Sequence, residues 1–127
     1  MNQTINARPP VWVGHVYLSV KDVASAAQWL ETVGLRRIVV RDEAAVLEMR
    51  GGTHVVVRPG VAAGGTAPFD LMVDDVDAAH RDYAEKGLSP SPIRQRQWRY
   101  DHDSFDLPGP DGWIFTVHNS HVGDLPV

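Results

Sequence analysis

The chain of 127 residues has no cysteine and no long apolar run. The lack of cysteine excludes disulfide bonds, thiolate metal ligands and cysteine nucleophiles, and it fits a reducing compartment. No apolar stretch approaches the roughly 18 residues of a membrane span, and residues 1–10 lack the apolar core of a signal peptide. We therefore expect a cytoplasmic protein with no membrane partner.

Aromatic residues and basic residues are also scarce. Aromatic residues make up 8% of the chain, and 16 acidic against 12 basic residues give a net charge of −4, which repels nucleic acid at long range. Residues 94–100 interleave arginines with a tryptophan and a tyrosine, as proteins that bind single strands do. One such segment in an acidic chain is more typical of a solvated loop, so we expect no nucleic-acid partner.

What the chain does contain is an internal repeat at an offset of 53 residues. Residues 20–23 (VKDV) return as residues 73–76 (VDDV), and Gly34-Leu35 returns as Gly87-Leu88. Such self-similarity indicates two copies of one structural unit, while the length allows only one compact core. We predict a single domain over residues 1–127, composed of module one (about 11–58), a linker (59–66), module two (about 67–119) and a tail (120–127).

Each module begins with a strand and a helix. In module one, residues 11–20 alternate with the period of a strand, and apolar residues recur at helical spacing within residues 21–33. Asp22 is suited to cap this helix, and Gly34 is suited to end it in the left-handed conformation. Module two repeats the pattern with a strand at 69–73 and a helix at 75–86. Asp75 is suited to cap this helix and Gly87 to end it.

Further strands complete each module. In module one we predict strands at 37–41, 45–50 and 53–58, the last two joined by a two-residue turn at Gly51-Gly52. In module two the later strands fall at 104–107 and 113–118, where the offset has grown from 53 to 60. Module two therefore carries about seven extra residues, which we place in an enlarged loop over 94–102.

Several of these segments together resemble the vicinal oxygen chelate superfamily, which includes glyoxalase I, extradiol dioxygenases, fosfomycin-resistance enzymes and bleomycin-binding antibiotic-resistance proteins. The matching segments are residues 14–20 (GHVYLSV), Asp22-Val23, Gly34-Leu35 and Pro110-Asp111-Gly112, and the resemblance covers about residues 11–119. It implies an α+β fold, in which two pseudo-twofold-related βαβββ modules form a curled mixed sheet around a cleft. It also implies a homodimer, which fits the apolar edges that two half-sheets would leave.

Metalloenzymes of this superfamily take ligands from the first and last strands of each module. Carried over to this chain, those positions are His15, Val56, Pro68 and Thr116. Only His15 binds a divalent cation well, whereas a catalytic metal site needs about three protein ligands. We therefore expect no metal and no other cofactor.

A rearranged metal site is the alternative. Strand parity places Glu48, His54 and His118 on the cleft face together with His15, and such donors suit zinc, iron, nickel or manganese. A residue two places along a strand is displaced by about 6.6 Å, however, which is much longer than a metal–ligand bond of about 2 Å. That displacement favours the metal-free interpretation.

We predict that the cleft binds a small molecule. Aromatic surface with a few convergent polar groups is typical of ligand pockets, and tryptophan and arginine can stack or hold an anionic ligand. The predicted cleft residues are His15, Tyr17, His54, Arg58, Asp70, Met72 and His118, with Trp98, Arg99 and His102 as a lid from the enlarged loop. His15 is the leading candidate for an acid or base, because histidine titrates near neutral pH.

Three classes of function follow from these observations. The first is a binding protein of the glyoxalase/bleomycin-resistance-like type, with an aromatic or anionic ligand. The second is a glyoxalase-like lyase or a dioxygenase-like oxidoreductase, with a rearranged metal site or with metal-free histidine catalysis. The third is a structural or regulatory partner of another protein.

Overall fold

The computed structural model describes residues 8–61, 64–98 and 101–120. It has an α+β fold with two helices and two mixed sheets. In chain order the elements are β1 (His15–Val20), α1 (Val23–Val33), β2 (Arg36–Val40), β3 (Ala45–Glu48), β4 (His54–Pro59), β5 (Gly65–Thr66), β6 (Leu71–Met72), α2 (Val76–Glu85), β7 (Ser104–Pro108) and β8 (Trp113–His118). No helix in these described ranges is long and apolar enough to cross a membrane.

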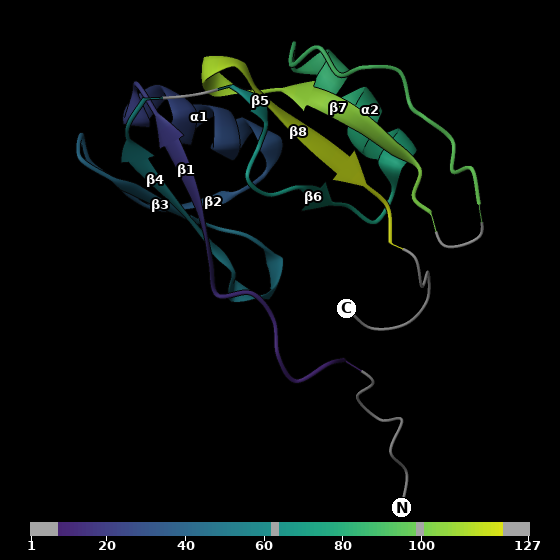
Figure 1. Cartoon of the computed structure of the whole chain (residues 1–127), viewed down its shortest axis with the longest axis horizontal. Helices are drawn as coiled ribbons and strands as arrows, with labels where there is room; N and C mark the ends of the chain where they lie inside the picture. Colours follow the sequence, from purple (N-terminus) through teal and green to yellow (C-terminus); the bar gives the residue numbers. More distant parts are fainter. Residues whose placement is uncertain (1–7, 62–63, 99–100, 121–127) are drawn as a thin grey trace, which may run out of the picture.

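The first sheet has the strand order β1-β4-β3-β2, in which β1 is parallel to β4 and the other neighbours are antiparallel. The second sheet is centred on β8, which pairs with β7 on one side and with β5 and β6 on the other. β5 and β6 are both parallel to β8, so together they hold the place that β1 holds beside β4 (Figure 1). An isolated bridge between Arg94 and Ser104 lies where β2 would pair with β3.

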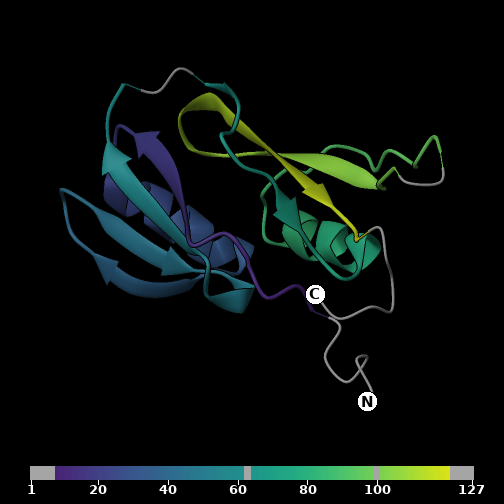
Figure 2. The same cartoon turned by 60° about the horizontal axis from the view of Figure 1, so that its bottom comes forward.

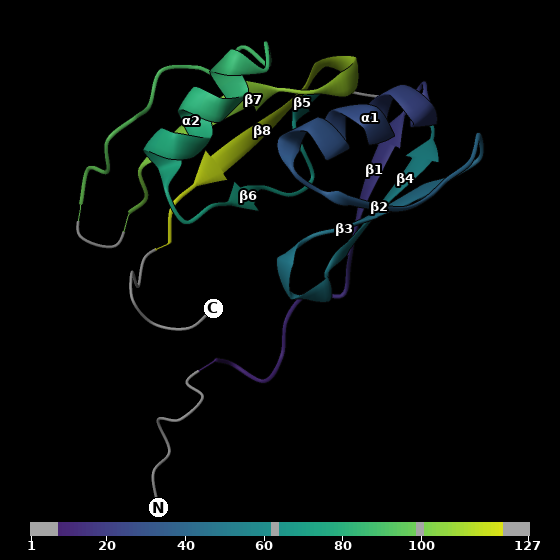
Figure 3. The same cartoon turned by 180° about the vertical axis from the view of Figure 1, so that it is seen from behind.

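Each helix packs on one face of the sheet of its own module, and the two modules lie side by side (Figure 2). The same arrangement is seen from behind in Figure 3. The helix-facing strand positions are apolar, and the buried residues of both modules form one cluster. Its largest fully buried side chains are Leu18, Leu30, Leu47, Phe105, Leu107 and Phe115.

Contacts between the modules come from both helices and from β8. The ring of Phe115 in β8 lies 5.1 Å from Trp29 in α1. The hydroxyl of Tyr83 in α2 donates to the carbonyl of Val33 at 2.9 Å, and burial raises the pKa of Tyr83. These buried contacts fix the two sheets relative to each other.

The helix ends follow the sequence prediction. The carboxylates of Asp22 and Asp75 accept hydrogen bonds from backbone N–H groups three residues ahead, at 3.1 and 3.0 Å. The first of these bonds lowers the pKa of Asp22. Gly34 and Gly87 end the helices with φ of 131° and 77°, a region that only glycine enters readily. The matched caps and stops of the repeat are therefore confirmed.

Several predicted boundaries are wrong. The first strand begins at His15 rather than at residue 11, because its partner β4 begins at His54, directly opposite. The predicted strand 69–73 is reduced to Leu71–Met72, and the linker contains β5. Pro68 separates β5 from β6 and brings no N–H to the ladder.

The turn between β3 and β4 also differs from the prediction. The N–H of Met49 donates to the carbonyl of Thr53 at 2.8 Å, which encloses three residues, Arg50–Gly52, rather than two. These residues form a short 3₁₀ turn in which Gly51 has φ of 83°. The remaining predicted helix and strand ends lie within two residues of the observed ends.

Candidate small-molecule site

The candidate site begins on the face of the first sheet that points away from α1. Along β1 and β4, every second side chain is buried against the helix, and the set Leu18, Val20, Val55 and Val57 is at most 1% exposed. The alternate positions therefore point to the opposite face. They carry four of the predicted ligand-binding residues: His15, Tyr17, His54 and Arg58.

We call these four residues the Tyr17 cluster. The parallel register places His15 opposite His54, and their ring centroids are 5.5 Å apart. The rings of His15 and Tyr17 are within 26° of parallel, with centroids 6.5 Å apart. The guanidinium carbon of Arg58 lies 4.7 Å from the centroid of the Tyr17 ring, within cation–π range. The structure thus brings together the first-sheet half of the predicted site.

Glu48 joins this face from β3. One of its carboxylate oxygens lies 3.0 Å from Nε2 of His54, and the other accepts a hydrogen bond from Arg36 in β2. Arg36 is not among the predicted site residues. The signal for it is the antiparallel pairing of Arg36 with Glu48 across β2 and β3, which places the two side chains on one face. The charge of Glu48 is therefore compensated within the protein.

On the second sheet, Asp70, His102 and His118 form what we call the His118 cluster. Nε2 of His118 lies 3.1 Å from Oδ2 of Asp70, and the His102 ring is 4.6 Å from the His118 ring. A carboxylate can only accept here, so Nε2 carries the proton and Nδ1 of neutral His118 holds a lone pair. Nδ1 is buried and has no hydrogen-bond partner in the described part of the chain. Met72, also a predicted site residue, is 52% exposed on β6.

A further polar network on the second sheet was not predicted. Both oxygens of Asp106 accept hydrogen bonds from the guanidinium of Arg94, at 3.0 Å each, and Thr116 donates to Oδ1 at 3.1 Å. The Arg94 hydrogen bonds lower the pKa of Asp106 and raise that of Arg94, although partial burial opposes both shifts. The signal that could have found this network is the pairing of Asp106 with Thr116 in the β7–β8 hairpin.

The lid residues are only partly placed. Trp98 is 61% exposed in the long connection between α2 and β7, and Arg99 lies outside the described residues. Nδ1 of His102 is hydrogen-bonded to the carbonyl of Asn119, which anchors this ring beside the end of β8. His102 thus lies with His118, while the ligand role of Trp98 and Arg99 stays a prediction.

The four residues of the rearranged metal site come from both sheets. His15, Glu48 and His54 are on the first sheet, whereas His118 is paired with Asp70 on the second. Across residues 8–61, 64–98 and 101–120, no group of three or more His, Asp or Glu side chains is arranged to hold a metal ion.

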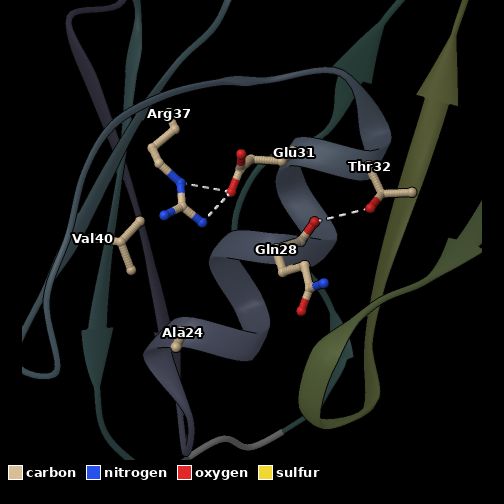
Figure 4. A pocket seen from close by; sticks show the side chains of 6 residues that line it. All are labelled: Ala24, Gln28, Glu31, Thr32, Arg37 and Val40. Atoms are coloured by element: carbon tan, nitrogen blue, oxygen red, sulfur yellow. Dashed lines mark hydrogen bonds and ion pairs between the residues drawn. The ribbon is translucent and has the colours of Figure 1, made fainter.

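Two surface hollows lie elsewhere. One of about 600 Å³ is between α1 and β2, and Figure 4 shows Arg37 and Glu31 pointing toward each other across it, with hydrogen bonds of 2.6 and 2.9 Å. The other, of about 360 Å³, is next to the β3–β4 turn and is lined in part by Arg36 and Glu48. The first contains no predicted site residue, and its charged groups already satisfy each other.

Comparisons with known proteins agree on the fold. No family model matches the chain, and no curated protein matches it by sequence. Among solved structures, lactoylglutathione lyase from Agrobacterium tumefaciens matches with a TM-score of 0.71 and 16% identity, over 93% of this chain and 100% of that one. A bleomycin resistance determinant encoded on the transposon Tn5 matches with a TM-score of 0.68 and 15% identity, over 87% and 98% of the two chains.

A third similar structure is a fosfomycin resistance protein from Listeria monocytogenes, with a TM-score of 0.69 and 17% identity, over 86% of this chain and 90% of that one. At such identities the likeness concerns the backbone. It extends over most of both chains in all three cases, so it includes both modules. The protein therefore has the fold of the lactoylglutathione lyase, bleomycin-resistance and fosfomycin-resistance structures, which agrees with the fold that the resemblance to the vicinal oxygen chelate superfamily implies.

Proposed function

We propose that the protein binds a small organic molecule on the sheet faces that point away from the helices, by stacking and hydrogen bonding rather than through a metal. The Tyr17 cluster carries this proposal. It places an aromatic ring, two imidazoles and a guanidinium within a few ångströms of one another. Known ligand sites combine the same kinds of groups.

The exposure of the cluster supports a binding role. Tyr17 is 50% exposed, although an aromatic ring in the core would contribute hydrophobic stabilisation. Polar groups used only for stability are normally paired inside the protein, as Arg94 and Asp106 are on the second sheet. The Tyr17 cluster instead directs its aromatic and cationic surface to solvent.

The test is a titration with a library of small organic fragments, followed by NMR of the backbone amides. We expect bound fragments to shift the amide signals of residues 15–17 and 54–58. Tyr17→Ala should weaken the binding of these fragments by about 1 to 3 kcal/mol, by analogy with base–aromatic stacking. Ile38→Ala is the control, because Ile38 is 52% exposed on β2 and outside the cluster. Fragments that bind only in the hollow beside α1, or none at all, would contradict the proposal.

The metal-free part of the proposal has its own measurement. Protein purified without added metal or chelator should contain less than a stoichiometric amount of zinc, iron, nickel or manganese by elemental analysis. Adding any of these ions should raise the melting temperature by no more than about a degree, because binding to the native state must stabilise it. One bound ion per chain would move the protein to the class of metalloenzymes.

The His118 cluster favours a second candidate, a metal-free acid–base enzyme. Asp70 fixes the tautomer of His118, as a carboxylate does for a catalytic imidazole, and leaves the lone pair at Nδ1. Because Nδ1 is buried, a ligand proton reaches it only when the side chains around it rearrange. Deuterium exchange into acidic C–H bonds of bound fragments would support this activity if His118→Gln abolishes it, and equal exchange by that variant would exclude it.

We also propose a homodimer. β1 is an edge strand of its sheet, and the segment before it exposes Val11, Trp12 and Val13, by 77, 65 and 57% respectively. An exposed strand edge beside apolar side chains favours pairing with another chain. Sedimentation at tens of micromolar should give a dimer, and a monomer at that concentration would contradict this proposal.

A further inference from the structure

We propose that the ligand of the Tyr17 cluster is a planar aromatic anion, specifically an aryl carboxylate, and that Arg58 recognises its carboxylate. This inference rests on the binding function proposed above and specifies its ligand class. It is drawn from the charges of the cluster and from the orientation of the guanidinium.

The first sheet presents three charged side chains on the face opposite α1: Arg36, Glu48 and Arg58. Glu48 is hydrogen-bonded by both Arg36 and His54, so these groups leave no free negative charge. Arg58 forms no ion pair with any carboxylate in the described part of the chain. This face therefore carries an uncompensated positive charge, although the whole chain has a net charge of −4.

The orientation of Arg58 suits it to bind a carboxylate. Its guanidinium carbon lies over the ring of Tyr17, 4.7 Å from the ring centroid. The aromatic ring is not a carboxylate partner, and the planar fork of N–H donors of a guanidinium can form two parallel hydrogen bonds with a carboxylate. Tyr17 thus holds Arg58 in place without satisfying its donors.

The neighbouring rings suit an aromatic body for the ligand. The rings of His15 and Tyr17 are stacked with centroids 6.5 Å apart, and the His54 ring is tilted against that of His15 at 5.5 Å, so three rings lie beside the guanidinium. A flat ligand ring can cover these rings while its carboxylate reaches Arg58. Cationic ligands are disfavoured, because Glu48, the carboxylate that the described strands place on this face, is already paired.

The experiment compares three probes of similar size by NMR titration: benzoate, its neutral amide benzamide, and the saturated anion cyclohexanecarboxylate. We expect benzoate to bind about fivefold or more tightly than either of the others, because it alone combines charge with a flat ring. Raising the salt concentration should weaken the binding of benzoate and leave the binding of benzamide nearly unchanged, since only the charged contact is screened.

The decisive variant is Arg58→Gln, with Arg81→Gln as the matched control. Arg81 is an exposed arginine of α2, so its substitution changes the net charge equally but leaves the cluster intact. Arg58→Gln should weaken the binding of benzoate about 10-fold or more and the binding of benzamide by less than about twofold. Arg58→Lys should recover only part of the loss, because an ammonium keeps the charge but lacks the planar fork.

The outcomes separate this inference from the proposed function. If benzamide binds as tightly as benzoate, or if Arg58→Gln leaves benzoate unaffected, the ligand class is wrong, while binding at the Tyr17 cluster stands. If neither the probes nor any library fragment shifts the amides of the cluster, both proposals fail. A melting curve of Arg58→Gln that matches the wild type confirms that any lost binding is local.

Discussion

The two modules follow one plan but differ at their edges. The first sheet has four continuous strands with one register shift, between Arg37 and Val39 in the β2–β3 pair, whereas the second has an interrupted outer strand, β5 and β6, and a single bridge at Arg94 in place of the strand that corresponds to β2. The inner pairs, β3–β4 and β7–β8, have no register shift. Core packing therefore preserves the inner strands, while the edges, which pack less, can lose regular pairing.

The outward faces differ more than the folds. On the first sheet the guanidinium of Arg58 lies over the ring of Tyr17 and has no carboxylate partner among the described residues. On the second sheet Arg94 does have a carboxylate partner, because Arg94 and Asp106 share two hydrogen bonds. We interpret the open face as suited to recognition and the closed network as suited to stability. The predictions below test this contrast.

The largest effect is expected from Phe115→Ala, which tests whether the modules fold as one unit. Phe115 is fully buried and contacts Trp29 of module one and Phe69 of module two. Its truncation should reduce the free energy of unfolding by about 3 to 5 kcal/mol. Urea unfolding followed by tryptophan fluorescence and by circular dichroism should give one coincident transition. Two separate transitions would show that the modules unfold independently.

A smaller loss is expected from Gly109→Ala before the β7–β8 turn. A Cβ at Gly109 would lie 2.8 Å from Cε2 of Phe115, whose buried ring has no room to move. We expect a destabilisation of about 1 to 3 kcal/mol by overpacking, measured by thermal or urea unfolding. Gly14→Ala, before β1, is the control, because a Cβ there meets no atom within 4 Å. Equal effects of the two substitutions would contradict this account.

The smallest effect is expected from the polar networks. Asp106→Asn should lower the free energy of unfolding by about 1 kcal/mol at neutral pH. The effect is small because the Asp106 side chain is 38% exposed and solvent weakens its ion pair with Arg94. Glu48→Gln on the first sheet should lower the free energy of unfolding by less than Asp106→Asn does, because the Arg36 side chain that pairs with Glu48 is 75% exposed. A larger loss for Glu48→Gln would reverse the contrast between the two faces.

The effect of Asp106→Asn should also depend on pH. The folded pKa of Asp106 lies below the ordinary value of 3.8, so the unfolded chain binds the proton more readily. The stabilisation is therefore present above about pH 3.8 and is lost as the pH falls through the folded pKa. Urea unfolding at neutral pH and near pH 2 should show the difference between wild type and variant shrinking in acid. A constant difference would exclude the ion pair as its cause.

Much of the fold could be predicted because its signals are local. A helix cap such as Asp22 and a stop such as Gly34 act within a few residues of their own position, and strand alternation fixes which side chains face the core. The start of β1 and the interruption at Pro68 were not predicted. They depend on where the partner strand begins and on a missing N–H in the ladder, which are properties of pairs of strands.

The sequence by itself determined the repeat, the two helices and the face of each strand on which the site residues lie. Only the tertiary structure decided which of those residues meet. The register of β1 with β4 brings His15, Tyr17, His54 and Arg58 together. His118 instead pairs with Asp70 on the second sheet, and Arg94 forms hydrogen bonds with Asp106. Contacts between residues far apart in the sequence depend on strand register and packing, which no local pattern specifies.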